Sequence, residues 1–264
     1  MIEGGSWRPS TIPALFAAIT LADGACILFD TGYSARFFSE TSKFPFSIYA
    51  HITPVCVSEQ TGARSELARV GISSDAVSHI VISHFHPDHI GGLQDFPNAK
   101  FVCARSGYNV VRNKQGFPAL RHGYLRGLVP ADFAERAIFV EDAPRIALPP
   151  NMMPFQWGYN LFDNPHLIIV DLPGHATGHL GMYIKSASLT YFLVGDACWL
   201  SRTFVERKLP HPLARLIFTD MQEYSQTIDK LHELRNNNPS LEIVPSHCVE
   251  LWERLQSQQP QAVS

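Results

Sequence analysis

The fold of this chain is decided by one stretch, Ser83-His84-Phe85-His86-Pro87-Asp88-His89, which brings three imidazoles and one carboxylate together within six residues. The stretch directly follows the apolar run Ile80-Val81-Ile82, which is typical of a buried strand. Because side chains alternate along an extended chain, the first two histidines would point the same way, and the Asp-His pair would fall on the turn that follows. Polar groups taken from water need partners, so the cluster indicates a metal ion or a pair of them rather than a solvated polar turn.

Three motifs later in the chain offer the ligands that a single turn cannot supply. Each follows a short apolar run and precedes or joins a turn, which is where a rigid scaffold presents functional groups. The motifs are Leu172-Pro173-Gly174-His175, Val194-Gly195-Asp196 and Val244-Pro245-Ser246-His247. We therefore expect the histidines and the aspartate that end these motifs to join the early cluster in space.

The ordered set of motifs resembles that of the metallo-β-lactamase-fold hydrolases. The quoted motifs are preceded by Leu28-Phe29-Asp30-Thr31-Gly32, another element of that superfamily, and the resemblance spans roughly residues 12–250. It implies an α/β fold, a four-layer αββα sandwich, with a dinuclear metal centre in a cleft at one sheet edge. The complete ligand set, the spacing and the size are most similar to N-acyl homoserine lactonases and related lactone or ester hydrolases.

The resemblance also implies a role for each ligand. It assigns to the first metal His84, His86 and His175, and to the second metal Asp88, His89 and His247. It assigns Asp196 as the bridge between the two metals. The nitrogen-rich first site suits Zn²⁺, and iron, manganese or cobalt also fit such a site. A hydroxide held between the metals would be the nucleophile, because Lewis acidity lowers the pKa of the bound water toward neutrality. Asp88 is a candidate acceptor for the proton of that water.

One residue departs from the lactonase pattern. In the lactonases a tyrosine three residues after the bridging aspartate points at the substrate carbonyl and donates a hydrogen bond; here Trp199 occupies that position. An indole donates through its ring N–H but can neither ionise nor accept. Trp199 is therefore either a hydrogen-bond donor in the catalytic group or a pocket wall or core residue.

The chain is thus predicted to be a metal-dependent hydrolase that cleaves an ester, most readily a lactone, with Asp88, Asp196 and Trp199 as candidate catalytic residues. A thioesterase of the glyoxalase II type, a phosphodiesterase or a sulfatase could use the same centre, because fold does not fix substrate. A non-catalytic, metal-bound binding or regulatory module is a further alternative. The intact ligand set argues against this last alternative.

Composition is consistent with one compact unit. The 264 residues are 45% hydrophobic, and we expect a single domain over residues 1–264 built of two halves, about 1–145 and 146–264. The net charge of −3 and the scattered cations leave no basic face for nucleic acid. The apolar stretch Pro13–Ala22 is too short to span a bilayer, and residues 1–6 lack the features of a signal peptide. Five well-separated cysteines favour reduced thiols and a cytoplasmic location over a disulfide framework.

The expected partner is a small-molecule substrate with an apolar acyl or aromatic group. Two segments rich in aromatic residues and proline, Phe37–Val57 and Pro149–Asn164, either overhang the metals as an apolar wall or pack on their own scaffold or against a second subunit, so a homodimer is possible. Asp30 and His179 do not belong to the ligand set, and we expect them to brace ligands by hydrogen bonds.

The hydrophobic pattern predicts the order of the elements. A hairpin over residues 14–29 is followed by an irregular segment over 33–59, and the second half begins near Arg145. The other expected strands and helices are Thr61–Val70 (helix), His79–Ser83 (strand), Lys100–Ala104 (strand), Arg105–Gln115 (helix), Phe117–Phe133 (ambiguous), His166–Asp171, Met182–Ile184 and Tyr191–Val194 (strands), Gln222–Arg235 (helix), Leu241–Val244 (strand) and Val249–Gln256 (helix).

Overall fold

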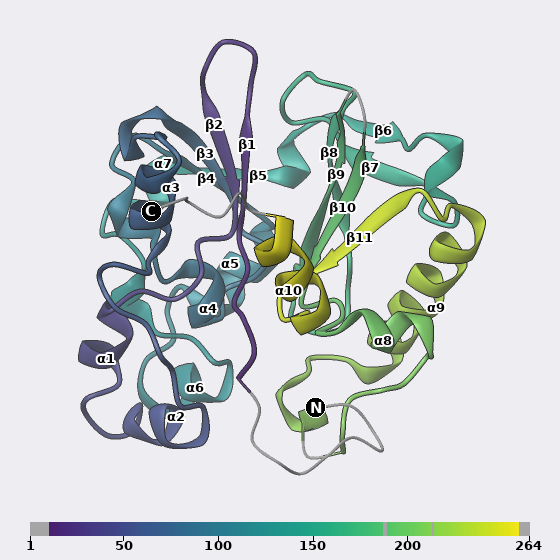
Figure 1. Ribbon diagram of the computed structural model, residues 1–264. Helices are drawn as coiled ribbons and strands as arrows, with labels where there is room; N and C mark the ends of the chain where they lie inside the picture. Colours follow the sequence, from purple (N-terminus) through teal and green to yellow (C-terminus); the bar gives the residue numbers. More distant parts are fainter. Residues whose placement is uncertain (1–10, 187–188, 213, 259–264) are drawn as a thin grey trace.

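Two β-sheets lie face to face in the computed structural model, and helices cover the outer face of each (Figure 1). The structure describes residues 11–258 except 187, 188 and 213, so the expectation for residues 1–6 lies outside the described residues. This arrangement is the four-layer αββα sandwich that the sequence predicts. Among the described residues, no helix combines the length and the apolar composition needed to cross a bilayer.

The first sheet has its strands in the order in which they occur along the chain: β1 (Ala17–Thr20), β2 (Cys26–Phe29), β3 (Val77–Val81), β4 (Lys100–Cys103) and β5 (Ala137–Phe139). β1 and β2 form the predicted antiparallel hairpin, whereas β2, β3, β4 and β5 run parallel. β3 therefore lies in the middle of the sheet, and the histidine-rich stretch leaves the sheet at its carboxyl end.

In the second sheet, too, neighbouring strands follow one another along the chain, from β6 at one edge to β11 at the other. Its strands are β6 (Arg145–Ala147), β7 (Trp157–Tyr159), β8 (Leu167–Asp171), β9 (Leu180–Lys185), β10 (Thr190–Gly195) and β11 (Leu241–Pro245). β10 and β11 are parallel, and the other neighbours are antiparallel. The carboxyl ends of β8, β10 and β11 consequently point the same way. The sheet begins at the predicted division near residue 145; that both halves form one domain stays a prediction.

The helices divide between the two outer layers and the loops. They are α1 (Arg36–Glu40), α2 (Ser47–Ile52), α3 (Ala63–Arg69), α4 (Pro87–Ile90), α5 (Arg105–Val111), α6 (Gly116–Arg121), α7 (Phe133–Arg136), α8 (Ser201–Val205), α9 (Met221–Asn237) and α10 (Val249–Gln258). Short 3-10 turns occupy η1 (Ser74–Ala76), η2 (Leu93–Asp95), η3 (Arg126–Leu128), η4 (Val140–Asp142), η5 (Pro150–Met152) and η6 (Ala214–Ile217). Figure 1 shows α1–α7 beside the first sheet and α8 and α9 beside the second.

Strand alternation explains why the sheets are buried on both faces. In β2, Ile27 and Phe29 pack into the core between the sheets, whereas Cys26 and Leu28 pack into the core under the helices of the first half. The residues of β8 alternate in the same way between the central core and the core under α9. A strand covered on both faces needs apolar side chains at every position, which is why these segments appear as continuous apolar runs.

α9 is the longest helix, and its boundaries follow from its sequence. Asp220 caps its first turn, with its Oδ1 accepting hydrogen bonds from the N–H groups of Gln222 (2.8 Å) and Glu223 (2.9 Å). Its buried face carries residues three or four apart, which is the spacing of one helical face. These residues are Tyr224, Thr227, Ile228, Leu231 and Leu234.

One sequence expectation about the elements is wrong. Residues 33–59 were expected to be irregular but contain α1 and α2, and neither helix has a side-chain N-cap that a sequence could reveal. Both helices are too short to be stable alone. They are held by tertiary packing, in which Phe37 is buried and Tyr49 packs against the core of the first half. The ambiguous segment Phe117–Phe133 falls mainly on α6 and η3, and only its last residue opens α7.

Each aromatic-rich segment packs partly on its own scaffold and also leaves large apolar side chains exposed, such as Phe44 and Ile52. In Pro149–Asn164, Met152 and Phe155 are buried in the core under α9, and Trp157 lies in strand β7. In Phe37–Val57, Phe37 is buried in the core of the first half. Neither segment lines the pocket that lies beside the candidate ligands. The expectation that they form an apolar wall over the metals is therefore not borne out at that pocket.

Candidate metal centre

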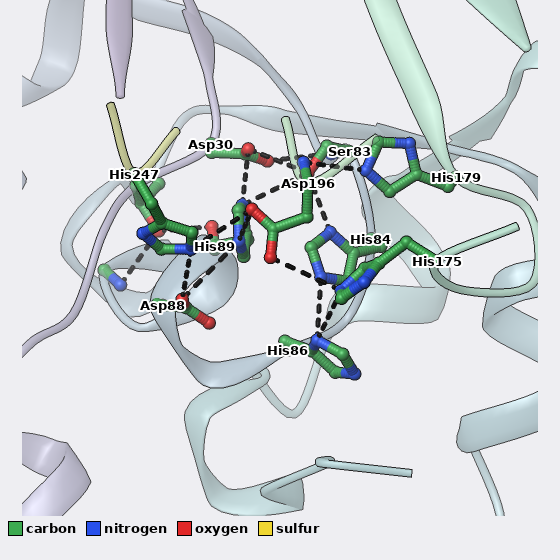
Figure 2. Close-up of polar contacts among 12 residues, drawn as sticks. Asp30, Ser83, His84, His86, Asp88, His89, His175, His179, Asp196 and His247 are labelled. Carbon is green, nitrogen blue, oxygen red and sulfur yellow. Dashed lines mark hydrogen bonds and ion pairs between the residues drawn. The ribbon is translucent and has the colours of Figure 1, made fainter. Parts of the chain in front are cut away.

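The carboxyl ends of four strands bring the predicted ligands together. The turn from β3 into α4 supplies four of them, and the loops after β8, β10 and β11 supply one each. Figure 2 shows their side chains converging, with Asp196 between two groups. These groups are His84, His86, His175 with Asp196, and Asp88, His89, His247 with Asp196. The candidate ligand atoms of each group all lie within 4.8 Å of one another.

In the first group three ring nitrogens face one another. His84 Nε2 lies 2.9 Å from His86 Nδ1, and His175 Nε2 lies 3.2 Å from the same atom. His86 is the N-cap residue of α4, so its ring projects from the point where the chain turns into the helix. Nitrogens this close repel unless a proton or a cation lies between them. The first group therefore suits a cation with imidazole ligands.

The second group combines two imidazoles with two carboxylates. His247 Nε2 lies 3.2 Å from Asp88 Oδ2, and His89 Nε2 lies 3.7 Å from the same oxygen. Asp88 and His89 are neighbours in the short helix α4, which begins with Pro87 and is buried throughout. The mixed oxygen and nitrogen donors of the second group suit a wider range of metals than the donors of the first group.

Asp196 turns one carboxylate oxygen toward each group. Its Oδ1 lies 3.1 Å from His247 Nε2 and 3.4 Å from His89 Nε2, while its Oδ2 lies 3.3 Å from His175 Nε2. Asp196 follows Gly195, whose φ of +51° turns the chain sharply at the end of β10. A carboxylate in this position is suited to bridging two cations.

Asp30 braces the second group through His89, as the sequence predicts. Its side chain is fully buried and accepts hydrogen bonds from the Ser83 N–H (2.7 Å) and the Ser83 hydroxyl (2.8 Å). Its Oδ2 also lies 2.7 Å from His89 Nδ1, which directs Nε2 of that ring toward the other ligands. Asp30 has a φ of +61°, an uncommon backbone for a residue with a side chain and one that such sites often contain.

Hydrogen bonds to the main chain fix two further side chains. His247 donates from Nδ1 to the Pro13 carbonyl at 2.7 Å, so that its Nε2 faces the ligands. The His179 ring lies tilted against that of His84, with centroids 5.0 Å apart, and its Nε2 accepts a hydrogen bond from the Asp196 N–H at 3.0 Å. Burial lowers the pKa of His179 to about 3, which keeps the ring neutral and able to accept. His179 therefore braces the main chain of the bridging residue.

Trp199 is committed to the bridging aspartate. Its indole Nε1 donates to Asp196 Oδ2 at 3.0 Å. Its ring lies edge-on to that of His175, with centroids 6.1 Å apart, and tilted against that of Phe218, with centroids 5.4 Å apart. The side chain is half-buried. In this geometry the indole N–H contacts the bridging carboxylate, and a catalytic role for Trp199 stays a prediction.

The charges of the groups follow from their surroundings. Burial and the neighbouring imidazoles hold the pKa of His84 well below its ordinary value, so its ring is neutral and offers a lone pair. Burial also opposes a charge on His247, but Asp196 and Asp88 outweigh it and raise the pKa of His247 to about 10. Burial would raise the pKa of Asp88, but His89 and His247 lower it to about 2. Both carboxylates are therefore ionised at neutral pH, and protons on the facing imidazoles compensate them.

Metal ions fit this donor set. His89 Nε2 and Asp196 Oδ1 are buried and have no hydrogen-bond partner, and buried polar atoms without partners are costly. Both atoms belong to the second group and point into it. A divalent cation would satisfy them and would replace the protons that the imidazoles otherwise carry. No cysteine belongs to either group, and all five cysteines are free thiols.

Two tyrosines lie beside the centre: Tyr33, to which no sequence motif assigns a role, and Tyr49, which belongs to the aromatic-rich segment Phe37–Val57. Tyr33 directly follows the Asp30-Thr31-Gly32 turn, whose main chain is hydrogen-bonded to α4 through Thr31 N–H to His89 O (2.9 Å). The rings of both tyrosines pack edge-on against Phe37, with centroids 5.2 and 5.8 Å away. Burial and the charge of Asp88 raise the pKa of both phenols well above the ordinary value, so both stay protonated. The aromatic residue after the glycine was the available signal for Tyr33.

A pocket of about 210 Å³ opens beside the first group. His86 and His175 form one side of it, and apolar side chains such as Val111 and Phe218 form much of the rest. Arg121 and His122, at the end of α6, also line it. No sequence motif connects these two residues with the ligands.

The comparisons with known proteins agree with this geometry. Residues 14–247 match the Metallo-beta-lactamase superfamily. The chain is 25% identical to a probable metallo-hydrolase of Mycobacterium tuberculosis over 246 residues, 88% of this chain and 73% of that protein. It is 26% identical to the N-acyl homoserine lactonase AttM of Azorhizobium caulinodans over 249 residues, 94% of this chain and 86% of that protein.

Solved structures share the fold. An N-acyl homoserine lactone hydrolase, solved with the product N-hexanoyl-L-homoserine at its catalytic metal centre, superposes with a TM-score of 0.66 at 19% identity. The superposition covers 94% of this chain and 88% of that one. At this level of identity the likeness concerns the fold.

Proposed function

The chain belongs to the metallo-beta-lactamase superfamily and is a metal-dependent hydrolase, and from that premise we propose that it cleaves carboxylic esters, with lactones as the preferred substrates. The observation that carries this proposal is the pair of His/Asp groups that share Asp196. Its two carboxylate oxygens face different groups, which is the arrangement required to hold two cations next to each other. Lactonases among the relatives support the lactone as substrate class.

Zn²⁺ is the metal that we propose for the centre. The first group offers three imidazole nitrogens and one carboxylate oxygen, a donor set typical of zinc, and the second offers two of each. When bound, the ions would act as Lewis acids that polarise a carbonyl and lower the pKa of water. Manganese, iron and cobalt accept the same ligands, so metal analysis must identify the ion.

The chain's own residues would orient the reactants. Asp88 is ionised at neutral pH and keeps 12% of its side chain exposed, so it is available to accept a proton or a hydrogen bond. Burial and the negative charges of Asp88 and Asp196 raise the pKa of Tyr33, so its phenol stays protonated and can donate a hydrogen bond to a substrate oxygen. Trp199 holds Asp196 through its indole N–H. We propose that Tyr33 supplies the phenol that Trp199 cannot.

The pocket beside the first group suits a small-molecule substrate. Its volume of about 210 Å³ and its apolar wall fit a short acyl chain or an aromatic ring. We propose such a group on the substrate. A cytoplasmic location and a possible homodimer stay predictions.

A substrate panel tests the proposed function. We expect zinc-loaded protein to hydrolyse lactones and aryl esters, and a chelator to abolish this activity. Thioesters and phosphodiesters in the same panel test the alternative hydrolases on this scaffold. If the protein hydrolysed thioesters or phosphodiesters but no lactone and no aryl ester, the proposed substrate class would be wrong. Metal binding without turnover of any member of the panel would favour a binding module.

A further inference from the structure

The pocket beside the first group carries positive charge without a compensating acid. No aspartate or glutamate lines it, whereas Arg121 and His122 do. Several other guanidinium groups on the surface are paired with carboxylates, for example Arg36 with Asp95 at 2.6 Å and Arg136 with Asp132 at 3.1 Å. Arg121 has no carboxylate partner within the described ranges 11–186, 189–212 and 214–258. The pocket therefore offers an unsatisfied cation to whatever enters it.

The neighbourhood of Arg121 strengthens this cation. Burial first, and then the charges of Lys114 and Arg121, lower the pKa of His122, so three basic side chains lie near one another. The His122 ring, largely neutral at pH 7, adds a hydrogen-bonding group beside the guanidinium. An arginine fork accommodates a carboxylate with two parallel hydrogen bonds.

The main chain fixes this cation relative to the metal ligands. Gly123 directly follows Arg121 and His122 and has a φ of +57°. A Cβ at residue 123 would lie 2.8 Å from His86 Cδ2, so the turn is in close contact with that ring. The turn that carries Arg121 thus packs against a candidate ligand of the first group. A molecule bound between them would span a set distance.

The remaining lining is apolar. The apolar residues of the lining are Phe85, Val110, Val111, Ile217 and Phe218. An apolar chain lying on these side chains would extend from the metal ligands toward Arg121. Neutral substrates would leave the guanidinium without a partner, whereas a substrate with a negative end would use it.

We propose that the preferred substrate carries a carboxylate, separate from the ester to be cleaved, which binds Arg121 while its apolar part lies in the pocket. This inference rests on the proposed function for the cleaved bond and adds the charge of the substrate. Arg121 is a specificity-determining residue under this proposal. Because Arg121 and His122 are exposed, the interaction is screened by salt and moderate in strength.

A matched pair of esters tests the proposal with the metal-loaded full chain. Para-nitrophenyl butanoate is neutral, and the mono-para-nitrophenyl ester of pentanedioic acid carries a terminal carboxylate. We expect wild type to favour the charged ester in kcat/KM, mainly through KM, and Arg121→Gln to reduce this preference roughly fivefold, the upper range for an exposed ion pair. Arg121→Glu should reduce it further. The preference should also shrink between about 50 and 500 mM salt.

Arg64→Gln is the matched control. Arg64 is exposed on helix α3, does not line the pocket and also lacks a carboxylate partner among the described residues. This variant should keep the wild-type preference. Equal preference in wild type and Arg121→Gln, with both esters cleaved, would overturn the proposal and leave the proposed function intact.

A binding measurement separates the two proposals when neither ester is cleaved. Calorimetry would compare heptanoate with heptanamide on metal-loaded wild type and on Arg121→Gln. If heptanoate binds more weakly to Arg121→Gln than to wild type, while heptanamide binds equally to both, the charge preference would be supported even though ester cleavage had failed. Heptanoate binding that is the same in both proteins would overturn it.

Discussion

At the scale of single residues, Asp196 connects the two halves of the centre. Each of its carboxylate oxygens faces a different group of histidines, so an amide at this position would replace one charged oxygen with a donor. We expect Asp196→Asn to weaken both metal sites together, by at least about a hundredfold, and to lower metal content from two per chain. Elemental analysis of the purified protein measures this. Asp142→Asn is the control, because Asp142 forms an exposed ion pair with Arg105 and belongs to neither group of candidate ligands. Full metal content and full rate in Asp196→Asn would exclude the bridging role.

Trp199 is a second test at this scale, because its N–H contacts the bridging carboxylate. Trp199→Phe keeps an aromatic ring against Phe218 but removes the donor to Asp196 Oδ2. We expect roughly tenfold weaker metal binding, as for other residues that orient ligands, measured by competition with a chelating dye. Trp157→Phe, at a half-exposed tryptophan of β7, should not change metal binding.

The same position tests the lactonase resemblance. Trp199→Tyr introduces the phenol that lactonases carry three residues after the bridging aspartate. If lactone hydrolysis does not improve relative to aryl ester hydrolysis, the missing phenol is not what separates this protein from those enzymes.

Tyr33 gives the third prediction about a single residue. Tyr33→Phe removes a hydroxyl that burial and Asp88 keep protonated, without changing the packing of the ring on Phe37. We expect kcat to fall by roughly tenfold or more, with KM and metal content little changed, because the donor acts on charge that develops during the reaction. Tyr191→Phe, away from the centre, is the control. A loss of metal in Tyr33→Phe would instead assign the hydroxyl a structural role.

At the scale of elements, the turn after α6 supports a ligand. Gly123→Ala would both strain a left-handed residue and place a Cβ against the His86 ring. Gly116→Ala is a matched control, since Gly116 has a similar φ of +56° but nothing within 4 Å of an added Cβ. Both variants should lose about 1–2 kcal/mol of stability, and only Gly123→Ala should also lose affinity at the first metal site. Equal metal affinity in the two variants would show that the turn does not position His86.

The elements also explain which parts of the fold sequence patterns can predict. Helix α9 was predicted closely because its buried residues repeat at helical spacing and Asp220 caps its start. Helices α1 and α2 were missed because they have no side-chain cap and are only five and six residues long. Their stability comes from packing against the first half, which a local pattern does not contain.

At the scale of the whole molecule, the metals would hold the two halves together. The ligands come from the turn after β3 and from α4 in the first half, and from loops after β8, β10 and β11 in the second. A ligand that binds only the folded state stabilises it by about 2.7 kcal/mol at one hundred times its Kd. We expect chelation to lower the Tm by roughly 5–10 °C, measured by calorimetry with and without added Zn²⁺. Asp196→Asn should respond much less. An unchanged Tm in wild type would mean that the site is not occupied under the conditions used.

The motifs along the chain, together with the family that they resemble, predict the layered fold and the seven candidate ligands. Strands buried on both faces must be continuously apolar, and ligands must follow their ends, so both features are written in local order along the chain. Only the tertiary structure decided which atoms meet. The carbonyl of Pro13 fixes His247 across 234 positions, Trp199 turns its N–H to Asp196, and Arg121 reaches the pocket through a turn packed on His86. Contacts between residues so far apart depend on how the sheets and loops pack, and a local sequence pattern carries no information about that packing.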